Sequence, residues 1–305
     1  MGPTLFEAVP NFSEGRDQAR IGRIVAAVRD VEGVIVLGLH SDQDHNRSVL
    51  TFAGEEDAVL EAAVALATAC MSEIDLASQA GEHPRMGSLD VLPFIPLEGA
   101  TLDDAARLAR QAGERISSLG VPVYLYEAAA TAPHRRNLAD VRRGGYEGLA
   151  ARIEGPLWQP DYGPSELDPR KGAVAVGARP FLVAFNAYLD TETVGVARAV
   201  ARKVRERDGG LEGVKALGLK VGGKAQVSMN LTKVEKTPIP VALEAVRFAA
   251  AENGASVEST ELVGLAPLEA ILQVARHYLM LQDLKKEHVL EAALWDKRQR
   301  RESGG

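Results

Sequence analysis

The chain has 305 residues, of which 46% are hydrophobic, and a formal net charge of −7. This length allows two domains of ordinary size, each with its own core. An acidic chain without a broad basic face is poorly suited to nucleic acid or to an anionic membrane, so we expect neither as a partner. Cys70 is the only cysteine, which excludes an internal disulfide and a cysteine-based zinc cluster. Because no export signal or membrane-spanning run stands out, we predict a cytoplasmic protein.

The first half of the chain predicts alternating strands and helices. Short β-rich apolar runs bounded by turn residues indicate strands, and apolar residues three and four positions apart indicate helices. In chain order, we predict strands at 5–10, 34–39, 47–52, 91–95 and 121–126, and helices at 17–31, 55–74 and 102–119. The resulting order is β-α-β-β-α-β with one further helix and strand.

The same element order recurs after a stretch rich in proline and glycine, residues 156–172, which is the best linker candidate. The second copy consists of a strand-like run at 173–189, a helix at 191–207, a hairpin at 214–231, a helix at 241–252 and an extended segment at 256–265. Two such copies predict the α+β class, with two ferredoxin-like subdomains whose antiparallel or mixed sheets carry helices on one face. We place these domains at 1–178 and 179–305.

The sequence GEHPR at residues 81–85 is the strongest candidate for a catalytic loop. Pro84 disfavours a helical conformation for His83, and Gly81 leaves the backbone before it unrestrained. Imidazole titrates near neutral pH, so His83 can accept and return a proton. A solvated surface histidine is the alternative interpretation, and the other polar clusters argue against it only in combination.

Three further polar clusters fall at strand ends or in loops. In PNFSEGR (10–16), Ser13 can cap the following helix while Arg16 faces an anion. The run DQDHNR (42–47) is acidic enough to suggest a cation site, but it lacks the glycine and the distal glutamate of a calcium loop, so we predict no metal. The third cluster, residues 161–179, contains glycines that allow a flat ligand to approach the backbone closely.

Eight motifs together resemble the glutamate formimidoyltransferase family, in which they occur in the same order. They are VPNFSEGR (9–16), HNRSV (45–49), GEHPRMG (81–87), PFIP (93–96), VPVYLY (121–126), DYGP (161–164), VGAR (176–179) and ELVGL (261–265). The resemblance extends from about residue 6 to about residue 279. It corresponds to the formiminotransferase part of the bifunctional formimidoyltransferase-cyclodeaminase and leaves no length for a cyclodeaminase domain.

The resemblance implies transfer of the formimino group of N-formimino-L-glutamate to N5 of tetrahydrofolate, a co-substrate, in histidine degradation, with the folate in a cleft between the two subdomains. It implies that His83 is the general base. The cationic formimino group and the anionic carboxylates call for acidic and basic side chains, and the suitable candidates are Asp42, Arg47, Glu82 and Arg85. The family's folate-binding loop maps onto residues 163–172, where Lys171 can meet the anionic tail. The folate candidates are Gly163, Pro164, Ser165, Lys171, Gly172 and Arg179.

One position departs from the family pattern. Where relatives have an acidic residue at the end of the second strand, this chain has His40, so either Asp42 supplies the carboxylate or the substrate differs. Transfer of a formyl group between 5-formyltetrahydrofolate and glutamate therefore remains an alternative, as does a folate-binding protein without catalysis. A metal-dependent hydrolase built on His40, Asp42, Asp44, His45 and His83 is a third. We expect a homodimer.

Overall fold

The structure, a computed structural model, describes residues 4–43, 45–79 and 85–302. Its internal contacts divide the chain into two units, Met1–Pro180 and Phe181–Gly305. Each unit combines one β-sheet with helices, which confirms the predicted α+β class. In the described part of the chain, no helix is both long and apolar enough to cross a membrane.

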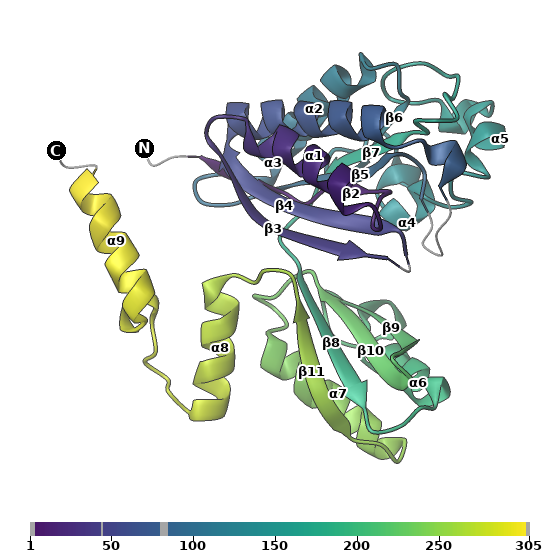
Figure 1. Cartoon of the computed structure of the whole chain (residues 1–305). Coiled ribbons are helices and arrows are strands. Elements are labelled where there is room, and N and C mark those ends of the chain that lie inside the picture. Colours follow the sequence, from purple (N-terminus) through teal and green to yellow (C-terminus); the bar gives the residue numbers. More distant parts are fainter. Residues whose placement is uncertain (1–3, 44, 80–84, 303–305) are drawn as a thin grey trace. The chain divides into compact units, whose positions relative to one another are not determined.

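The first unit is built on a mixed sheet (Figure 1). Its strands are β1 (Leu5–Ala8), β2 (Asn11–Phe12), β3 (Val34–Asp42), β4 (Arg47–Glu55), β5 (Leu89–Pro96), β6 (Val123–Glu127) and β7 (Val174–Ala178). The six longer strands lie in the order β3-β4-β1-β5-β7-β6, and the short β2 follows β1 between β4 and β5. Strand β1 is antiparallel to both of its neighbours, whereas β7 is parallel to β5 and β6.

Three helices cover one face of this sheet: α1 (Gln18–Arg29), α2 (Glu56–Glu73) and α3 (Leu102–Ser117). Strand β4 shows why, because its residues alternate between fully buried positions such as Leu50 and Phe52 and partly exposed ones such as Val49 and Thr51. At the β5, β7 and β6 end, the second face is covered by α4 (Leu138–Val141) and α5 (Leu149–Ile153). Among the described residues of the first unit, no helix covers the rest of that face, on β1 to β4, and we call it the helix-free face.

The linker predicted at residues 156–172 is wrong. This segment folds back on the first unit, where the Asp161 amide donates to the Val123 carbonyl (2.9 Å) and the Val123 amide to the Tyr162 carbonyl (3.0 Å). Strand β7 then inserts between β5 and β6, so the run predicted as one strand at 173–189 is two strands in different sheets. Pro180 separates them, because proline has no amide hydrogen to continue a ladder.

The second unit has an antiparallel sheet in the order β11-β8-β10-β9. These strands are β8 (Val183–Leu189), β9 (Val214–Val221), β10 (Lys224–Leu231) and β11 (Val257–Val263), and helices α6 (Val194–Val204) and α7 (Ile239–Glu252) cover one face. The predicted hairpin is confirmed: Val221 pairs with Lys224, and the two intervening glycines have φ of 56° and 82°, as a two-residue turn with positive φ requires. Helices α8 (Leu268–Leu279) and α9 (Leu290–Glu302) follow, and Ala270 of α8 packs on this core.

Candidate functional site

The clearest polar cluster of the first unit centres on Asp90, near the start of β5. Asn11 pairs with Val91 and Phe12 with Leu89, so Asp90 is the extra residue of a β-bulge. Bulges often redirect a side chain beside a functional site. Although the Asp90 side chain is almost completely buried, its Oδ1 accepts a hydrogen bond from the Met86 amide (2.9 Å).

Two arginines share the other carboxylate oxygen of Asp90. Arg142 Nη2 donates to Oδ2 at 2.7 Å, and Arg47 Nη1 lies 3.4 Å from the same atom. Burial raises the pKa of Asp90, and the cations of Arg142 and Arg47 oppose this shift. With two guanidinium partners and one amide donor, Asp90 has the hydrogen-bonding pattern of an ionised carboxylate.

Arg47 begins β4 and is held from two sides. Its Nε and Nη2 both donate to Asn11 Oδ1, at 2.9 Å and 2.6 Å. Burial lowers the pKa of Arg47 to about 10, a shift that Asp90 opposes and the nearby Arg142 cation reinforces. The guanidinium is therefore fixed in place and charged at neutral pH.

The motif that predicted the catalytic loop is only partly described. Glu82 and His83 lie outside the described residues, and the residues on either side of that segment are joined: Arg85 Nη2 donates to the Gln79 carbonyl at 2.7 Å. Arg85 also lies 3.4 Å from Glu147 Oε1 and 5.7 Å from the centre of the Tyr146 ring. Since the Met86 amide binds Asp90, Met86 is linked through Asp90 to Arg47.

Asp42 and His45 form a pair in the turn between β3 and β4. The Asp42 carboxylate accepts from the His45 amide (2.9 Å), and its Oδ2 lies 2.7 Å from His45 Nδ1. In the β3–β4 ladder, His40 is opposite Val49 and Asp42 is opposite Arg47. Paired residues project to the same side of a sheet, so His40 and Asp42 both belong to the helix-free face.

The prediction that Ser13 caps the following helix is wrong. Ser13 Oγ donates to the Gly87 carbonyl (2.8 Å), and the cap of α1 is Asp17, which accepts from the Ala19 and Arg20 amides at 3.0 Å each. Arg16 Nε donates to the Gln43 carbonyl (2.8 Å). The motif thus links α1 to the strand that follows the His83 segment.

The proposed folate loop is shaped by two glycines with positive φ, Gly163 at 86° and Gly172 at 72°. A Cβ at Gly163 would lie 2.4 Å from the Val121 carbonyl oxygen, and one at Gly172 would lie 2.3 Å from the Met86 carbonyl oxygen. Any side chain would displace the backbone at both positions. The packing of the first unit therefore requires both glycines, whether or not a ligand is present.

The other folate candidates are spread over the unit. Lys171 Nζ donates to the Leu119 carbonyl (2.9 Å), and Ser165 Oγ donates to Gln159 Oε1 (2.7 Å), while Pro164 is exposed. Arg179 lies beyond the far end of β7, where its Nη1 donates to the Pro180 carbonyl (3.1 Å). The structure therefore does not bring Arg179 together with residues 163–172.

Residues proposed for other chemistry lie apart. Cys70 is buried, and burial raises the pKa of its thiol, as befits a core residue. Among the described residues, no group of three or more His, Cys, Asp or Glu side chains could hold a metal ion. Two members of the alternative metal site, Asp44 and His83, lie outside the described residues.

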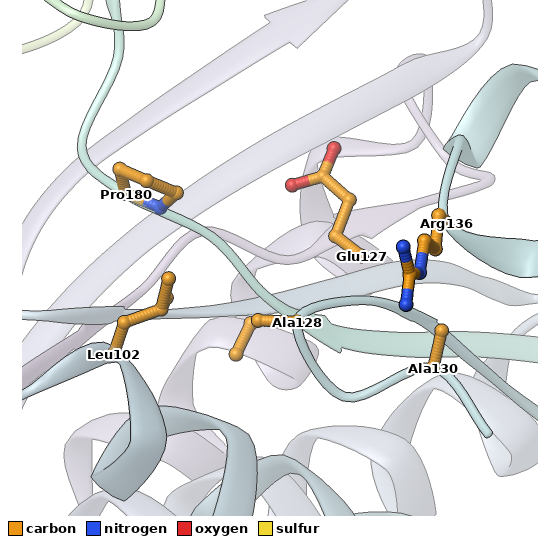
Figure 2. A pocket seen from close by; sticks show the side chains of 7 residues that line it. Leu102, Glu127, Ala128, Ala130, Arg136 and Pro180 are labelled. Atoms are coloured by element: carbon orange, nitrogen blue, oxygen red, sulfur yellow. The ribbon is translucent and has the colours of Figure 1, made fainter. Parts of the chain in front are cut away.

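A cavity of about 430 Å³ lies at the carboxyl ends of β6 and β7 (Figure 2). This is the end of the strands opposite to the Asp90 cluster. It is lined by Leu102, Glu127, Ala128, Ala130, Arg136, Ala178 and Pro180. Strands β5 and β7 are parallel, and Asp90 is near the start of β5 whereas the cavity is at the end of β7. The cavity and the Asp90 cluster are therefore separate and share no residue. Of the predicted site residues, only Arg179 adjoins the cavity in sequence.

Sequence reasoning missed Arg142, which has the shortest contact to Asp90. It is 52 residues away from Asp90 along the chain and falls in a charged run, VRRGG, that looks like an ordinary solvated loop. A carboxylate between apolar strand residues was the available signal, because such a residue is seldom buried without a charged partner.

Taken together, the first unit is an α+β domain in which arginines gather around a buried carboxylate at one end of the strands. The model of the formiminotransferase domain, N-terminal subdomain, matches residues 5–179, and that of the formiminotransferase domain matches residues 184–294. The glutamate formimidoyltransferase of Streptococcus pyogenes serotype M1 is 42% identical over 92% of this chain and 94% of its own length.

The glutamate formimidoyltransferase of Thermoplasma acidophilum is 43% identical over 94% of this chain and 96% of its own length. The formimidoyltransferase-cyclodeaminase of Rattus norvegicus is 40% identical over 94% of this chain but only 54% of its own length. The chain belongs to the formiminotransferase family, which confirms the resemblance inferred from its motifs.

Proposed function

We propose that this chain is a glutamate formimidoyltransferase, which transfers the formimino group of N-formimino-L-glutamate to N5 of tetrahydrofolate. The observation that carries the proposal is a sequence identity of 42–43% to two proteins of that name, over 94–96% of their length. The polar cluster of the first unit is consistent with it, because buried, anchored arginines suit the two carboxylates of the glutamate moiety.

In this proposal Arg47 and Arg85 bind substrate carboxylates, whereas Asp42 and Glu82 face the cationic formimino group. Arg47 is held by Asn11 and Asp90, and Arg85 by the Gln79 carbonyl, so both cations are ordered before a substrate arrives. Such ordering reduces the entropy lost on binding. Asp42 lies on the same face as His40, two residues further along β3, and can supply the carboxylate that position 40 lacks.

His83 is proposed to move the proton. N5 of tetrahydrofolate attacks the amidine carbon, forming a C–N bond and a tetrahedral intermediate. His83 accepts the N5 proton and returns it to the glutamate nitrogen as the second C–N bond breaks. Atoms and charge balance without a covalent enzyme intermediate and without a metal.

For the folate, the proposal uses residues 163–172, among which Lys171 carries the positive charge that would suit a carboxylate of the folate tail. Arg179 lies beyond the other end of β7, so in this proposal it would meet a different part of the ligand. Lys171 would have to release the Leu119 carbonyl to reach such a carboxylate.

An assay of the purified chain tests the whole proposal. Formiminoglutamate and tetrahydrofolate should yield 5-formiminotetrahydrofolate and glutamate, detected by mass spectrometry, and the rate should be unchanged by EDTA. Absence of turnover with tight tetrahydrofolate binding would support the folate-binding alternative instead. Loss of activity with EDTA that returns with a divalent metal would support the hydrolase alternative.

The role of His83 predicts that His83→Ala loses most of its activity and still folds. Proton transfer by a positioned side chain accelerates a reaction roughly 10²- to 10⁴-fold, so kcat should fall by that factor. His45→Ala is the matched control, since it removes an imidazole that pairs with Asp42, and it should lower kcat much less. Thermal midpoints measured in parallel separate chemistry from folding, and an active His83→Ala enzyme would remove the central assignment.

One observation favours formyl transfer as a second candidate. His40 places an imidazole on the helix-free face where the family pattern has a carboxylate, which lowers the negative charge available to a cationic formimino group. A formyl group is neutral and needs no such charge. Steady-state assays with formiminoglutamate and with 5-formyltetrahydrofolate plus glutamate separate the two, and His40→Asp should shift kcat/KM toward the formimino donor.

We also propose a homodimer. Helix α9 exposes Leu290, Leu294 and Trp295 at 77%, 51% and 62%, an apolar group that a second copy of the chain would cover. Sedimentation velocity should give twice the chain mass, and Leu294→Glu should shift the protein toward the monomer.

A further inference from the structure

The cavity in Figure 2 lies where parallel strands commonly bind small molecules. Strands β5, β7 and β6 run in the same direction, and α3 connects β5 to β6. In sheets of this kind, ligands bind just beyond the carboxyl ends of the strands. The cavity lies at these ends of β6 and β7, and Leu102, the first residue of α3, is part of its wall. Its volume of about 430 Å³ is within the range of small-molecule pockets.

Two opposite charges line this cavity. Glu127 is the last residue of β6, and Arg136 lies in the segment that joins β6 to α4. Figure 2 shows the Glu127 carboxylate turned toward Pro180 and the Arg136 guanidinium turned toward Ala130. The two charges therefore lie at different places on the wall, so a ligand that carries both signs can meet each of them.

The side chain of Arg136 is accessible to a ligand. Arg136 is exposed, and in the described part of the chain no hydrogen bond or ion pair joins its guanidinium to another residue. Its neighbour Arg135 differs, because it is buried against Asp161. A guanidinium with accessible nitrogens binds a carboxylate through two parallel hydrogen bonds. Arg136 is therefore the group of the cavity that suits an anion.

Glu127 is held in a backbone conformation that costs free energy. Its φ of 50° lies in the left-handed region, which glycine adopts freely. The turn after β6 is closed by the Ala130 amide, which donates to the Glu127 carbonyl (3.1 Å), and by the Ala128 amide, which donates to the Ala178 carbonyl (3.0 Å). Glycine would make this turn without strain, and strained residues cluster at sites where the side chain has a role. The half-buried carboxylate of Glu127 is thus placed to bind a cation.

The rest of the wall is apolar and consists mostly of small side chains. It is made by Leu102, Ala128, Ala130, Ala178 and Pro180. Three methyl groups leave room for a short aliphatic group, and an apolar wall with a few polar groups is typical of a specific ligand site. Among the described residues that line the cavity, Arg136 is the single cation. A second carboxylate on the ligand would therefore have no partner here and would be repelled by Glu127.

We propose that this cavity binds a free α-amino acid with a small aliphatic side chain, with Glu127 accepting from the ammonium group and Arg136 donating to the carboxylate. An α-amino acid carries both charges at one end and its side chain at the other, which matches two charged groups on an otherwise apolar wall. The inference goes beyond the proposed transfer reaction and does not depend on it. Formiminoglutamate carries a second carboxylate, for which the cavity has no cation.

The test uses the full chain and three probes of nearly equal shape, titrated by NMR. L-Valine carries both charges, isovalerate lacks the ammonium group, and isobutylamine lacks the carboxylate. Wild type should bind L-valine about 10-fold more tightly than either fragment, because each fragment leaves one charged group of the cavity without a partner.

Two variants assign the charges. Glu127→Gln should weaken L-valine binding by about 5-fold or more and remove the preference for L-valine over isovalerate. Arg136→Gln should weaken L-valine binding similarly and remove the preference over isobutylamine. Glu114→Gln and Arg110→Gln are the matched controls, since both residues are exposed on α3 and do not line the cavity, and they should change nothing.

Four results would overturn the inference. The first is failure of both L-valine and the smaller L-alanine to bind to wild type. The second is wild-type affinity for L-valine in Glu127→Gln and Arg136→Gln variants that keep the wild-type thermal midpoint. Tighter binding of L-glutamate than of L-valine would contradict a ligand with one carboxylate. Displacement of L-valine by 5-formyltetrahydrofolate would assign the cavity to the folate instead. Turnover of formiminoglutamate by wild type bears on the proposed function alone.

Discussion

At the scale of single residues, Asp90 joins three parts of the first unit. It binds Arg47 at the start of β4, Arg142 in the loop after α4, and the Met86 amide just beyond the segment that carries His83. Because two arginines share one buried carboxylate, removing its charge leaves both cations poorly compensated. In the proposed function Asp90 is therefore a positioning residue for Arg47, the arginine proposed to bind substrate, rather than a catalytic group.

We predict that Asp90→Asn raises the KM for formiminoglutamate at least 10-fold, with a smaller change in kcat. The variant should also lose about 3 kcal/mol of stability, the usual cost of breaking a buried ion pair. Asp161→Asn is the control, because Asp161 pairs with Arg135 at 2.5 Å with both side chains 7% exposed. It should lose comparable stability and keep the wild-type KM. Equal KM values in the two variants would contradict the positioning role.

The outcome of the sequence predictions at these residues has a physical explanation. Arg47 and Arg85 were predicted as site residues because each adjoins a recognisable motif, and their roles stay predictions. Arg142 was missed because its importance arises only when the loop after α4 folds over β5, which no local spacing reveals. The glycines at 163 and 172 were assigned to the ligand, although close backbone packing already requires both.

Glu127 carries backbone strain at the edge of the cavity in Figure 2. Its φ is 50°, a region that glycine adopts freely and other residues adopt at a cost. We predict that Glu127→Gly raises the free energy of unfolding by about 1 kcal/mol. Ala128→Gly, at the next residue and without positive φ, should instead lower the free energy of unfolding, because glycine gives the unfolded backbone more freedom to lose on folding. Urea denaturation of both variants measures the difference, and a destabilised Glu127→Gly would show that its side-chain interactions outweigh the strain.

At the scale of elements, the start of α1 depends on a buried carboxylate. Glu14 Oε1 accepts from the Arg16 and Asp17 amides (2.9 and 3.1 Å), and Oε2 accepts from Arg20 (2.6 Å). Burial alone would raise the pKa of Glu14, but these hydrogen bonds and the Arg20 charge lower it below its ordinary value of 4.5. A carboxylate at a helix start also interacts favourably with the helix dipole.

This shift sets the direction of a pH effect. A carboxyl whose pKa is lower in the folded state stabilises the fold fully above its unfolded pKa, and this contribution disappears as the pH falls through the folded pKa. Glu14→Gln should therefore lower the free energy of unfolding by about 2 kcal/mol at pH 7. The difference in free energy of unfolding between the variant and wild type should become smaller below about pH 4.5. Glu98→Gln, an exposed substitution, is the control. A gap that stays constant down to pH 3 would contradict the assignment.

Most helices and strands were predictable, because one face of each is buried and apolar spacing records that face. The exceptions have identifiable causes. Strand β2 has only two residues, too few for a pattern, and β7 is buried on both faces, so its apolar run merged with that of β8. The loop of residues 156–172 has the composition of a linker but is held by backbone hydrogen bonds to β6.

At the scale of the whole molecule, each unit has its own hydrophobic core. The first is centred on residues such as Phe52 and Leu66, and the second on residues such as Phe185 and Val246. No described residue belongs to both of these clusters. A defect in one core should consequently be felt first by its own unit.

We predict that Val227→Ala, in the second core, costs about 2 kcal/mol. It should accelerate amide hydrogen exchange in β8 and β10 while β1 and β4 keep wild-type protection. Val176→Ala, in the first core, should show the reverse. Equal acceleration in both units by either variant would mean that they unfold as one cooperative body.

The insertion of β7 has a consequence for synthesis on the ribosome. Strand β7 pairs with both β5 and β6, and its residues 174–178 emerge about 80 residues after β5, so the side of β5 away from β1 stays unpaired in the nascent chain. Apolar edge strands attract other chains, and proline is one means of preventing this. The Phe94 carbonyl accepts from the Arg179 amide and so faces the open side of β5, as does Pro96 two residues further on. Pro96 therefore removes one hydrogen-bond donor from this open side. A proline of the motif PFIP (93–96) thus protects the open side of β5 in the growing polypeptide until β7 arrives.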